Sequence, residues 1–495
     1  MPTHSSLPST LRILFLASEA APLIKVGGLG DVAGSLPSAL RMIPGNLIEG
    51  RSLDVRLVIP YHGEVARKLL DPQPVASFLV NHPNGPIPTR AFVTQVGDVP
   101  VYMIEGAPIG TEAPVYTGDN YIDGLKYAYF SLAAVELARH LNWQPDILHA
   151  NDWHTALSVF TLAKQRLSRD PFFAQTRSVL SIHNLPFMGA GAERALDEFG
   201  IHPVRDSRLP EWARQFPLPL GLLAADRIVA VSPTYAQEIL TPEFGCGLQD
   251  FLISRSSIIS GILNGLDQES WDPTRDNALV QRFGIETLDQ REENKKALLQ
   301  EFDLPYDPKI PLLILISRMD QQKGIDLALE SLAQAANHSW QAILLGTGDP
   351  IIESACRSLQ AQFPDRVRAA IRFDTRLSRR MYAGGDILLM PSRYEPCGLA
   401  QMIGMRYGCV PLARSTGGLR DTIFDGAKDR PNNGFLFEEV KAEALTQAML
   451  RSFDRYKDRE AWHQLQVNGM TQDFSWEKSA VQYANLYFDL WENQR

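Results

Sequence analysis

Short runs of apolar and β-branched residues alternate with longer segments of helical periodicity along most of this chain. The runs that predict strands are Ile13–Ala17, Val55–Ile59, Asp146–Ala150, Ser178–Ile182, Arg227–Val231, Leu312–Ser317, Gln341–Leu345, Asp386–Met390 and Val410–Ala413. Strands that alternate with helices in this way are typical of parallel sheets with helices on both faces. The pattern therefore predicts an α/β protein.

The predicted strands fall into two blocks. Between them lies Ile262–Asp267, which contains Asn-Gly and is soon followed by Asp272-Pro273, and both dipeptides favour turns. A chain of 495 residues is long enough for two hydrophobic cores. We therefore expect one domain over residues 1–264 and a second over 265–475. A terminal helix is expected within 476–495, because Trp476–Trp491 repeats apolar residues at helical spacing.

Composition and charge exclude several classes of partner. The hydrophobic share of 45% and the charged share of 21% are typical of globular proteins, and a net charge of -9 offers no basic face to nucleic acid or to a membrane. The first apolar run is too short for a secretory signal, and Glu19 soon follows it. The 4 cysteines lack C-x-x-C spacing, so we expect neither disulfides nor a zinc site, and we expect a cytoplasmic location.

The first candidate motif is K-V-G-G-L-G-D, Lys25–Asp31, which lies between the first predicted strand and a helix predicted from Val32. Glycines here would let backbone N–H groups approach a ligand oxygen, and the helix N-terminus and Lys25 would add positive charge. A dinucleotide site is disfavoured because the next strand does not end in an acidic residue, and a P-loop is disfavoured because its lysine would follow the glycines. A glycine-rich turn beside a solvated lysine fits the motif equally well.

A basic pair follows the first strand of the second block. Arg318 stands at the strand end and Lys323 in the loop S-R-M-D-Q-Q-K-G. Ligands of open α/β sheets bind at the carboxyl ends of strands, and two cations there suit a diphosphate. The alternative is a solvated basic loop.

Two further loops of the second block carry candidate chemistry. Glu395, in the stretch Pro391–Leu399, stands where a loop turns into a helix, so its carboxylate could accept hydrogen bonds from sugar hydroxyls or could cap the helix. Ser415–Leu419 offers exposed amides after the next strand, which is the geometry of an anion nest or of a plain turn.

Polar residues also end two strands of the first block. Asp152 follows one of them and His183 follows the next. The pair could orient a hexose and stabilise positive charge at its anomeric carbon, whereas either residue alone is more often structural.

Sequence patterns for other chemistries are missing. No D-x-D motif is present to hold a divalent cation, so we expect no metal and no cofactor, and the charge of a leaving diphosphate falls to Lys25, Arg318, Lys323 and backbone amides. No G-x-S-x-G or H-E-x-x-H motif supports a hydrolase. Candidate sites at the strand ends of both blocks are expected to face each other across a cleft.

At these residues the chain resembles the bacterial and plant glycogen and starch synthases, which are retaining glucosyltransferases of the GT-B type with two facing Rossmann-like domains. The resemblance spans nearly the full length. It rests on motifs in the family's order and spacing: K-V-G-G-L-G-D-V, H-A-N-D-W-H-T-A-L, V-S-P-T-Y-A-Q-E-I, T-P-E-F-G-C-G-L, G-I-L-N-G-L-D, S-R-M-D-Q-Q-K-G, R-Y-E-P-C-G-L-A-Q-M and S-T-G-G-L-R-D-T.

The resemblance implies transfer of glucose from ADP-glucose to the non-reducing end of an α-1,4-glucan, with ADP-glucose and the glucan as partners. It implies that the terminal helix packs back on the first domain. The residues implied to be catalytic are Asp152, His183, Arg318, Lys323 and Glu395. Those implied to bind substrate are Lys25, Gly27, Gly28, Cys397, Gly398, Leu399, Thr416, Gly417 and Gly418.

Segments of the first domain depart from the family pattern. They are Asp123–Tyr127, where the family reads D-N-x-x-R-F, Pro186–Met188 within His183–Gly189, where it reads H-N-L-A-Y-Q-G, and Phe216–Leu220, where it reads N-F-L-K. These departures bear on the choice of acceptor, because the donor-side residues are intact. They leave open two alternatives: a glucan-binding or regulatory paralogue with weak transfer, and a related transferase with a different donor or acceptor.

Overall fold

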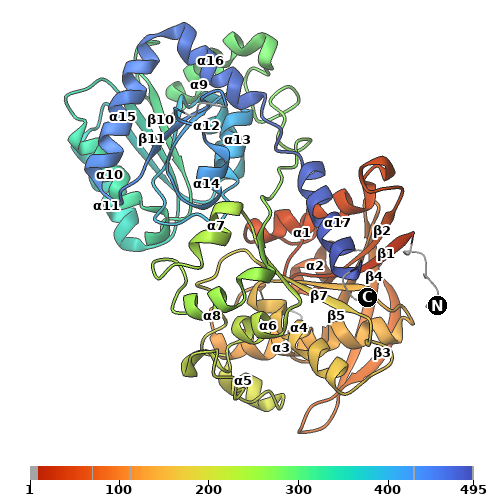
Figure 1. Cartoon of the computed structure of the whole chain (residues 1–495). Helices are drawn as coiled ribbons and strands as arrows, with labels where there is room; N and C mark the ends of the chain where they lie inside the picture. Colours follow the sequence, from red (N-terminus) through yellow and green to blue (C-terminus); the bar gives the residue numbers. More distant parts are fainter. Residues whose placement is uncertain (1–8, 70, 111–113, 427–429, 493–495) are drawn as a thin grey trace. The chain divides into compact units, whose positions relative to one another are not determined.

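The computed structural model describes residues 9–69, 71–110, 114–426 and 430–492. Its contacts divide the chain into two compact units, drawn in Figure 1. Unit 1 comprises Met1–Gly265 and Trp476–Arg495, and unit 2 comprises Leu266–Ser475. Among the described residues, no helix is long and apolar enough to cross a membrane.

The described part of unit 1 is built on a 9-stranded sheet with the order β3-β4-β5-β2-β1-β6-β7-β8-β9. Its strands are β1 (Thr10–Leu16), β2 (Ser52–Pro60), β3 (Gln73–Val80), β4 (Ile87–Val96), β5 (Val99–Gly106), β6 (Ile147–Asn151), β7 (Arg177–Ile182), β8 (Arg227–Ala230) and β9 (Ile259–Gly261). All neighbours pair in parallel except β3 with β4 and β4 with β5, which are antiparallel. The sheet is therefore mixed, and the parallel pattern predicted from the sequence holds for its central and β9-side strands.

Helices cover both faces of this sheet. On one face, alternate residues of β1 (Leu11, Ile13 and Phe15) share a buried cluster with α1 (Gly28–Met42) and α17 (Trp476–Glu492). Helices α3 (Asn120–His140) and α4 (Asp152–Leu167) contribute nothing to that cluster and pack against β3, β5, β6 and β7. Alternation of side chains along a strand explains why one apolar run serves two helical layers.

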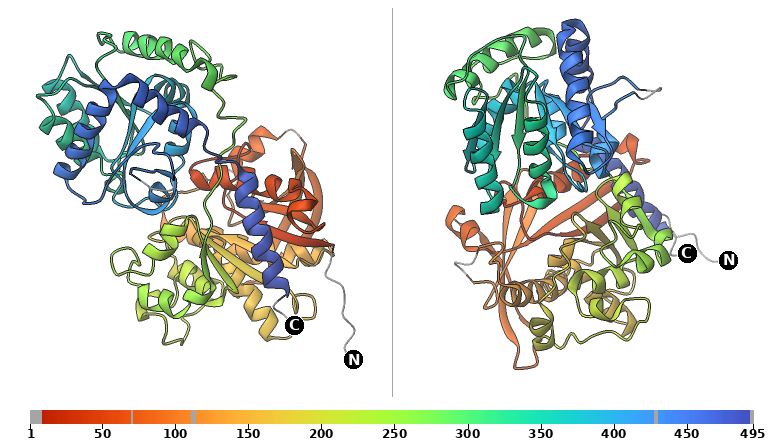
Figure 2. Two further views of the ribbon diagram at one scale, coloured as in Figure 1. Left: turned by 45° about the horizontal axis from the view of Figure 1, so that its top comes forward. Right: turned by 90° about the vertical axis from the view of Figure 1, so that its left-hand side faces the viewer.

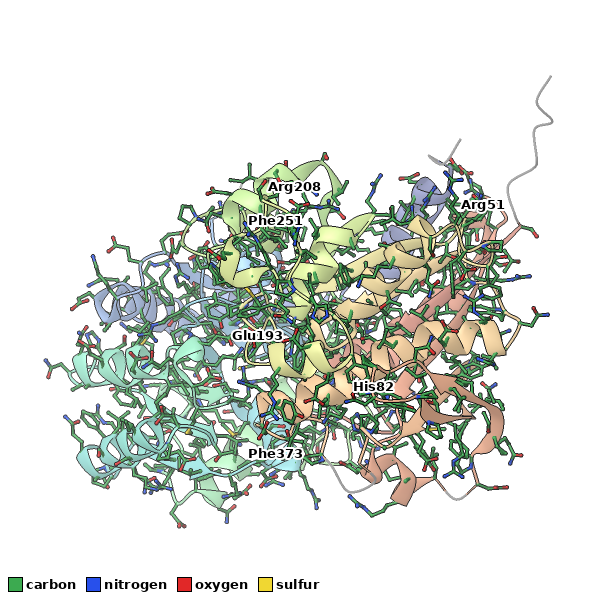
Figure 3. All side chains as sticks on the ribbon, turned by 90° about the horizontal axis from the view of Figure 1, so that it is seen from below. Arg51, His82, Glu193, Arg208, Phe251 and Phe373 are labelled. Carbon is green, nitrogen blue, oxygen red and sulfur yellow. The ribbon has the colours of Figure 1, made fainter. Side chains whose placement is uncertain are left out.

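Helix α17 packs against α1 although the two are far apart in the sequence, and Figure 2 (left) shows it alongside the strands of unit 1. Arg51, labelled in Figure 3, pairs with Glu492 at 3.0 Å and lies over the ring of Phe488. In the core, His149 Nδ1 lies 2.6 Å from the Tyr487 hydroxyl and its Nε2 lies 2.7 Å from Ser181 Oγ. Burial lowers the pKa of His149 to about 3, so this ring is neutral and both of its nitrogens are paired.

Replacing Tyr487 by phenylalanine should therefore lower the free energy of unfolding of unit 1 by about 1–3 kcal/mol, because one buried imidazole nitrogen loses its partner. Urea unfolding measures this change. Tyr121→Phe is a matched control, since Tyr121 bonds Glu198 at 2.6 Å at a more exposed position of α3. Equal stability of Tyr487→Phe and the wild type would contradict the account.

The described part of unit 2 holds a 6-stranded parallel sheet with the order β12-β11-β10-β13-β14-β15. Its strands are β10 (Leu312–Ile316), β11 (Gln341–Gly346), β12 (Val367–Ile371), β13 (Ile387–Met390), β14 (Val410–Arg414) and β15 (Phe435–Phe437). Helices α10 (Ile325–Gln334), α11 (Pro350–Gln362), α15 (Ala442–Lys457) and α16 (Arg459–Met470) share a buried cluster with one face of the sheet. Helices α9 (Arg291–Glu301), α12 (Thr375–Gly384) and α13 (Ala400–Arg406) lie outside that cluster, and α12 and α13 contact β10, β13 and β14.

The chain leaves unit 1 after Gly265 and returns at Trp476. A Cβ on Gly265 would lie 2.6 Å from the Cα of Trp476, so only glycine allows this approach. On the side of unit 2, Leu266 N donates to Phe474 O at 2.7 Å. The outgoing and returning segments therefore run side by side where the chain passes between units.

Candidate functional site

In each sheet the strand order places two candidate loops at a point where the order reverses. In unit 1 this point lies between β1 and β6, and in unit 2 between β10 and β13. Chains that leave neighbouring parallel strands there run in opposite directions and open a crevice at the carboxyl ends, where α/β proteins bind ligands. The loops after β1 and β6 carry Lys25 and Asp152, and those after β10 and β13 carry Lys323 and Glu395.

Lys323 and Glu395 form the best-defined polar pair in unit 2. The Nζ atom of Lys323 lies 2.9 Å from Oε1 and 2.7 Å from Oε2 of Glu395. Ser392 Oγ donates to the same carboxylate at 2.8 Å. The side chains are only 19% and 7% exposed, so the two charges are largely removed from water and hold each other in place.

The sequence folds locally so as to bring these loops together. Asp320 caps the short turn η5 (Gln321–Lys323) by accepting from Lys323 N at 3.1 Å. Gly324 follows with φ +62, and a Cβ there would lie 2.0 Å from Pro391 O at the end of β13. Arg393 N donates to Gln322 O at 2.8 Å, which ties the β10 loop to the β13 loop directly.

Arg318 is placed differently from Lys323. Its guanidinium pairs with Asp320 at 3.0 Å, and its side chain is 62% exposed. Among the described contacts it touches neither Glu395 nor Lys323. The structure thus leaves Arg318 at the rim of the carboxyl edge, where a ligand could reach it.

The turn Thr416–Gly418 packs on the segment that carries Glu395. A Cβ on Gly417 would lie 2.0 Å from Glu395 O, and one on Gly418 would lie 2.1 Å from Cys397 O. The N–H groups of Thr416 and Gly418 donate to Arg414 O and Glu395 O. The expectation of exposed amides in Ser415–Leu419 is therefore wrong: the turn is buried, because Gly417 and Gly418 pack closely on the Glu395 segment, and the Thr416 and Gly418 amides are engaged within the protein.

The segment Cys397–Leu399 leads into α13. Gly398 has φ +74, the left-handed region that favours glycine. The side-chain amide of Gln401 donates to Cys397 O and Gly398 O at 3.1 and 3.0 Å. The carbonyls of this segment are thus turned inward, while the N–H groups that open α13 lack intrahelical acceptors.

Asp152 and His183 lie together at the carboxyl edge of unit 1. Asp152 Oδ1 accepts from His183 N at 2.7 Å and from Asn184 N at 3.4 Å. His183 Nε2 lies 2.9 Å from Asn151 Oδ1. Asp152 also has φ +55, a strained conformation for a residue with a side chain.

Burial dominates the electrostatics of this pair. It raises the pKa of Asp152 to about 7, against the two backbone hydrogen bonds, and the nearby charge of Glu19 adds to the rise. Burial lowers the pKa of His183 to about 4. At neutral pH His183 is therefore neutral, and Asp152 is divided between its two protonation states.

The glycines of the first motif have separable roles. Helix α1 begins at Gly28, earlier than the predicted start at Val32. A Cβ on Gly28 would meet nothing within 4 Å, so this position is open to a ligand. A Cβ on Gly30 would lie 3.0 Å from Glu19 Oε2 and 3.1 Å from Lys25 Cγ, so Gly30 serves packing.

Lys25 and Gly27 already have partners in the protein. Lys25 Nζ pairs with Asp31 Oδ1 at 2.7 Å, with the lysine side chain 47% exposed. Gly27 N donates to the carboxylate of Glu19. Of the predicted amides in this turn, Gly28 N is the one at the open position.

Comparison with known proteins identifies the chain's relatives. Residues 12–254 match the family described as starch synthase catalytic domain, and residues 310–455 match glycosyl transferases group 1. A glycogen synthase of Geotalea daltonii is 38% identical over 96% of this chain and 98% of its own length. One from Anaeromyxobacter dehalogenans strain 2CP-1 is 40% identical over 96% and 98%.

The chain belongs to the glycogen and starch synthase family.

Solved structures agree with this assignment. The catalytic domain of starch synthase IV from Arabidopsis thaliana, bound to ADP and acarbose, is 31% identical and superposes with a TM-score of 0.84 over 98% of this chain and 100% of that chain. A sucrose-phosphate synthase from Thermosynechococcus elongatus, 17% identical over 98% of this chain and 100% of that chain, shares the fold with a TM-score of 0.58. The family resemblance and the GT-B class predicted from the motifs are confirmed.

In this member of the glycogen and starch synthase family, the segment Asp123–Tyr127, which departs from the family pattern, holds the loop that contains Val115 and Thr117. Lys126 pairs with Asp123 at 2.9 Å, and both side chains are buried. Lys126 Nζ also donates to Val115 O at 2.8 Å, and Asp123 accepts from Thr117 N at 3.0 Å. The charges of this segment thus hold the preceding loop. Met188, in the second departing segment, is 5% exposed and buried as well.

Two residues near the carboxyl edges of the sheets were not predicted from the sequence. Glu19 is buried in the loop after β1, beyond Ala17 and Ser18, and accepts hydrogen bonds from the glycine turn. Phe373, labelled in Figure 3, is 84% exposed on the loop after β12. Glu19 could have been found from the sequence, because it is an acidic residue soon after an apolar strand. Phe373 could not, because the strand that it follows, β12, was not predicted.

Within the part of the chain that is described, no group of three or more His, Cys, Asp or Glu side chains is placed to hold a metal ion.

Proposed function

We propose that this protein is a glycogen synthase, which transfers glucose from ADP-glucose to the non-reducing 4-hydroxyl of an α-1,4-glucan with retention of configuration. The supporting observation is that full-length relatives carry the name glycogen synthase, while this chain keeps a buried Lys323–Glu395 pair at the switch point of unit 2. The ADP and acarbose in the starch synthase IV structure are a nucleotide and an oligosaccharide, the two classes of ligand that this reaction requires. The proposed location is the cytoplasm.

Residues of unit 2 would hold the donor. Lys323 lies close enough to Glu395 that a donor could contact both, with Lys323 facing the diphosphate and Glu395 accepting from glucose hydroxyls. Arg318, exposed at the rim, would exchange its contact with Asp320 for a phosphate oxygen. The helix-opening amides after Cys397 and Gly398 would face the same sugar. The turn Thr416–Gly418 would lie near the distal phosphate, although its Thr416 and Gly418 amides donate within the protein.

Residues of unit 1 would serve the glucosyl group and the acceptor. The carboxylate of Asp152 would stabilise positive charge that develops at the anomeric carbon, and its hydrogen bond to His183 N fixes the position of that loop. Neutral His183 would exchange hydrogen bonds with sugar hydroxyls without adding charge. Lys25 and the open Gly28 N–H would add positive potential for the departing phosphate.

The chemical step exchanges one bond at the anomeric carbon. The bond from this carbon to the diphosphate oxygen breaks, and the acceptor 4-hydroxyl oxygen bonds to the carbon on the same face. The hydroxyl proton passes to the departing phosphate oxygen. ADP therefore leaves with this proton, and the new glycosidic oxygen carries no charge. No carboxylate of these motifs is an evident covalent nucleophile, which favours this route over a glycosyl-enzyme intermediate.

An incubation with radiolabelled ADP-glucose or UDP-glucose, with and without glycogen, tests the function. We expect label in the polymer with ADP-glucose and glycogen, and far less with UDP-glucose or without primer. Absence of polymer label with every donor would favour the paralogue that binds glucan without transfer. Label from another donor alone would favour a related transferase.

Phe373 offers a stacking surface for the nucleobase. Its ring is 84% exposed and follows β12 on the carboxyl side of the sheet, where the nucleotide is expected. Phe373→Ala should raise the KM for ADP-glucose about five- to tenfold with little change in kcat, because stacking contributes about 1 kcal/mol. Leu167→Ala is the control, since Leu167 is also 84% exposed but ends α4 in unit 1. An unchanged KM would remove Phe373 from the donor site.

A further inference from the structure

The carboxylate of Glu19 occupies the turn that precedes α1. Glu19 is 1% exposed, and its oxygens accept from Val26 N and from Gly27 N, the latter at 3.1 and 3.2 Å. The Tyr116 hydroxyl donates to Glu19 Oε1 at 3.1 Å. One buried carboxylate therefore gathers three donors from two separate loops.

The Glu19 carboxylate determines which amides of the glycine motif remain for a ligand. A helix N-terminus attracts negative charge, and the first amides of the turn are the groups that a ligand oxygen would use. Here the amides of Val26 and Gly27 already serve Glu19. The first amide of the turn that Glu19 does not engage is thus that of Gly28, where an added Cβ would meet nothing within 4 Å.

The residues that surround Glu19 are themselves held by hydrogen bonds, in the loop of Tyr116 and in the loop that precedes α1. Tyr116 OH also lies 3.1 Å from Ser18 Oγ, and Val115 O, next to Tyr116, accepts from Lys126 Nζ and Tyr127 OH. On the other side, Ala21 N donates to Gly30 O at 2.9 Å, which anchors the loop to α1. Burial raises the pKa of Glu19, and its hydrogen bonds oppose that rise, so the carboxylate depends on these donors.

Resting on the proposed function, we propose that Glu19 is a positioning residue, which holds Val26 and Gly27 in place and thereby fixes the open Gly28 N–H for an oxygen of the departing phosphate. Tyr116 completes this arrangement from the neighbouring loop. The role requires a carboxylate, since three donors converge on two oxygens that have no hydrogen of their own.

Glu19→Gln tests the role with little change of shape. The glutamine NH₂ group must face at least one of the three donors, so the turn shifts. We expect kcat to fall about tenfold while the KM for ADP-glucose changes less than about twofold, because the donor is held by unit 2. Glu19→Asp, which keeps the charge, should recover part of kcat. In a double-mutant cycle Tyr116→Phe should cost little more once Glu19 is glutamine.

Glu198→Gln is the matched control, because Glu198 also accepts from a tyrosine hydroxyl in unit 1 at 2.6 Å but lies on the short helix α5 (Glu193–Glu198). It should leave kcat unchanged. In Glu19→Gln, the melting temperature could fall and the KM could rise in proportion to the loss of kcat. That result would indicate a merely structural role for Glu19 and would overturn the proposal.

Amide hydrogen exchange provides a readout independent of transfer. Exchange at Val26 and Gly27 should accelerate in Glu19→Gln and not in Glu198→Gln, and unchanged exchange would overturn the proposal even if the enzyme were inactive. The proposed function and the positioning role of Glu19 can be contradicted by different results. A wild type that transfers no glucose contradicts the proposed function, whereas an active wild type matched by Glu19→Gln contradicts only the role of Glu19.

Discussion

Lys323→Ala is expected to lower kcat/KM for ADP-glucose by about 10²–10³, because removing one preorganised donor to a developing negative charge commonly costs that much. Among the described residues, the same change leaves Ser392 as the side-chain donor to the buried Glu395 carboxylate. Loss of activity can thus be accompanied by loss of stability, since an unpaired buried charge is costly. Initial rates of ADP release measure the first effect and thermal unfolding measures the second.

Lys323→Gln separates the two effects, because its amide can still donate to Glu395 but carries no charge for a diphosphate. It should retain most of the stability and little of the activity. Lys441→Ala is the control: Lys441 pairs with Glu439 at 2.6 Å, but both side chains are about two-thirds exposed, 65% and 66%, and exposed pairs contribute little. Wild-type kinetics in Lys323→Gln would remove Lys323 from the donor site.

Asp152→Asn is expected to lower kcat by about 10²–10³ and to abolish a dependence on pH. With its pKa near 7, Asp152 becomes a carboxylate as the pH rises through neutrality. The wild-type kcat/KM should therefore increase with pH through about 7, because the charged form stabilises the transition state. The residual kcat/KM of Asp152→Asn should not increase with pH through about 7.

The same shift predicts a change in stability of known sign. The pKa of Asp152 is about 7 in the folded protein and about 4 in an unfolded chain, so its contribution to stability is complete at low pH and is lost as the pH rises through 7. Between pH 5 and pH 8 the wild type should lose on the order of 2–3 kcal/mol relative to Asp152→Asn.

Asp146→Asn is a matched control at the other end of the same strand, where burial also raises the pKa and the carboxylate accepts from Arg12 N at 2.8 Å. It should leave the pH profile of activity intact. A profile unchanged in Asp152→Asn, or one shifted equally by Asp146→Asn, would contradict the role of Asp152.

The buried centres of both sheets were predictable from the sequence, and their margins were not. The second half of β1, Ile13–Leu16, and most of β11 are apolar on both faces, so each forms a continuous run of buried residues. At the margins, β3 lies at the sheet edge with Val75 and Leu79 exposed, and β15 has only 3 residues. Such strands lack a continuous apolar run, because they bury one face or very little.

Candidate site residues were predictable where chemistry and position coincide in the chain. Lys323 and Glu395 both follow predicted strands, and the structure brings them into contact. The ion pairs of Lys25 with Asp31 and of Arg318 with Asp320 could not be predicted, since they depend on side-chain direction. The engagement of Gly27 by Glu19 depends on how the loop turns back after β1 and was equally hidden.

Transfer of glucose from ADP-glucose to a growing α-1,4-glucan can be followed by proton NMR of the wild type with ADP-glucose and a maltooligosaccharide. One spectrum distinguishes α-linked, β-linked and free glucose. We expect α-1,4-linked residues and ADP to appear one for one. Free glucose in place of new linkages, β-linked product, or no ADP at all would contradict this expectation.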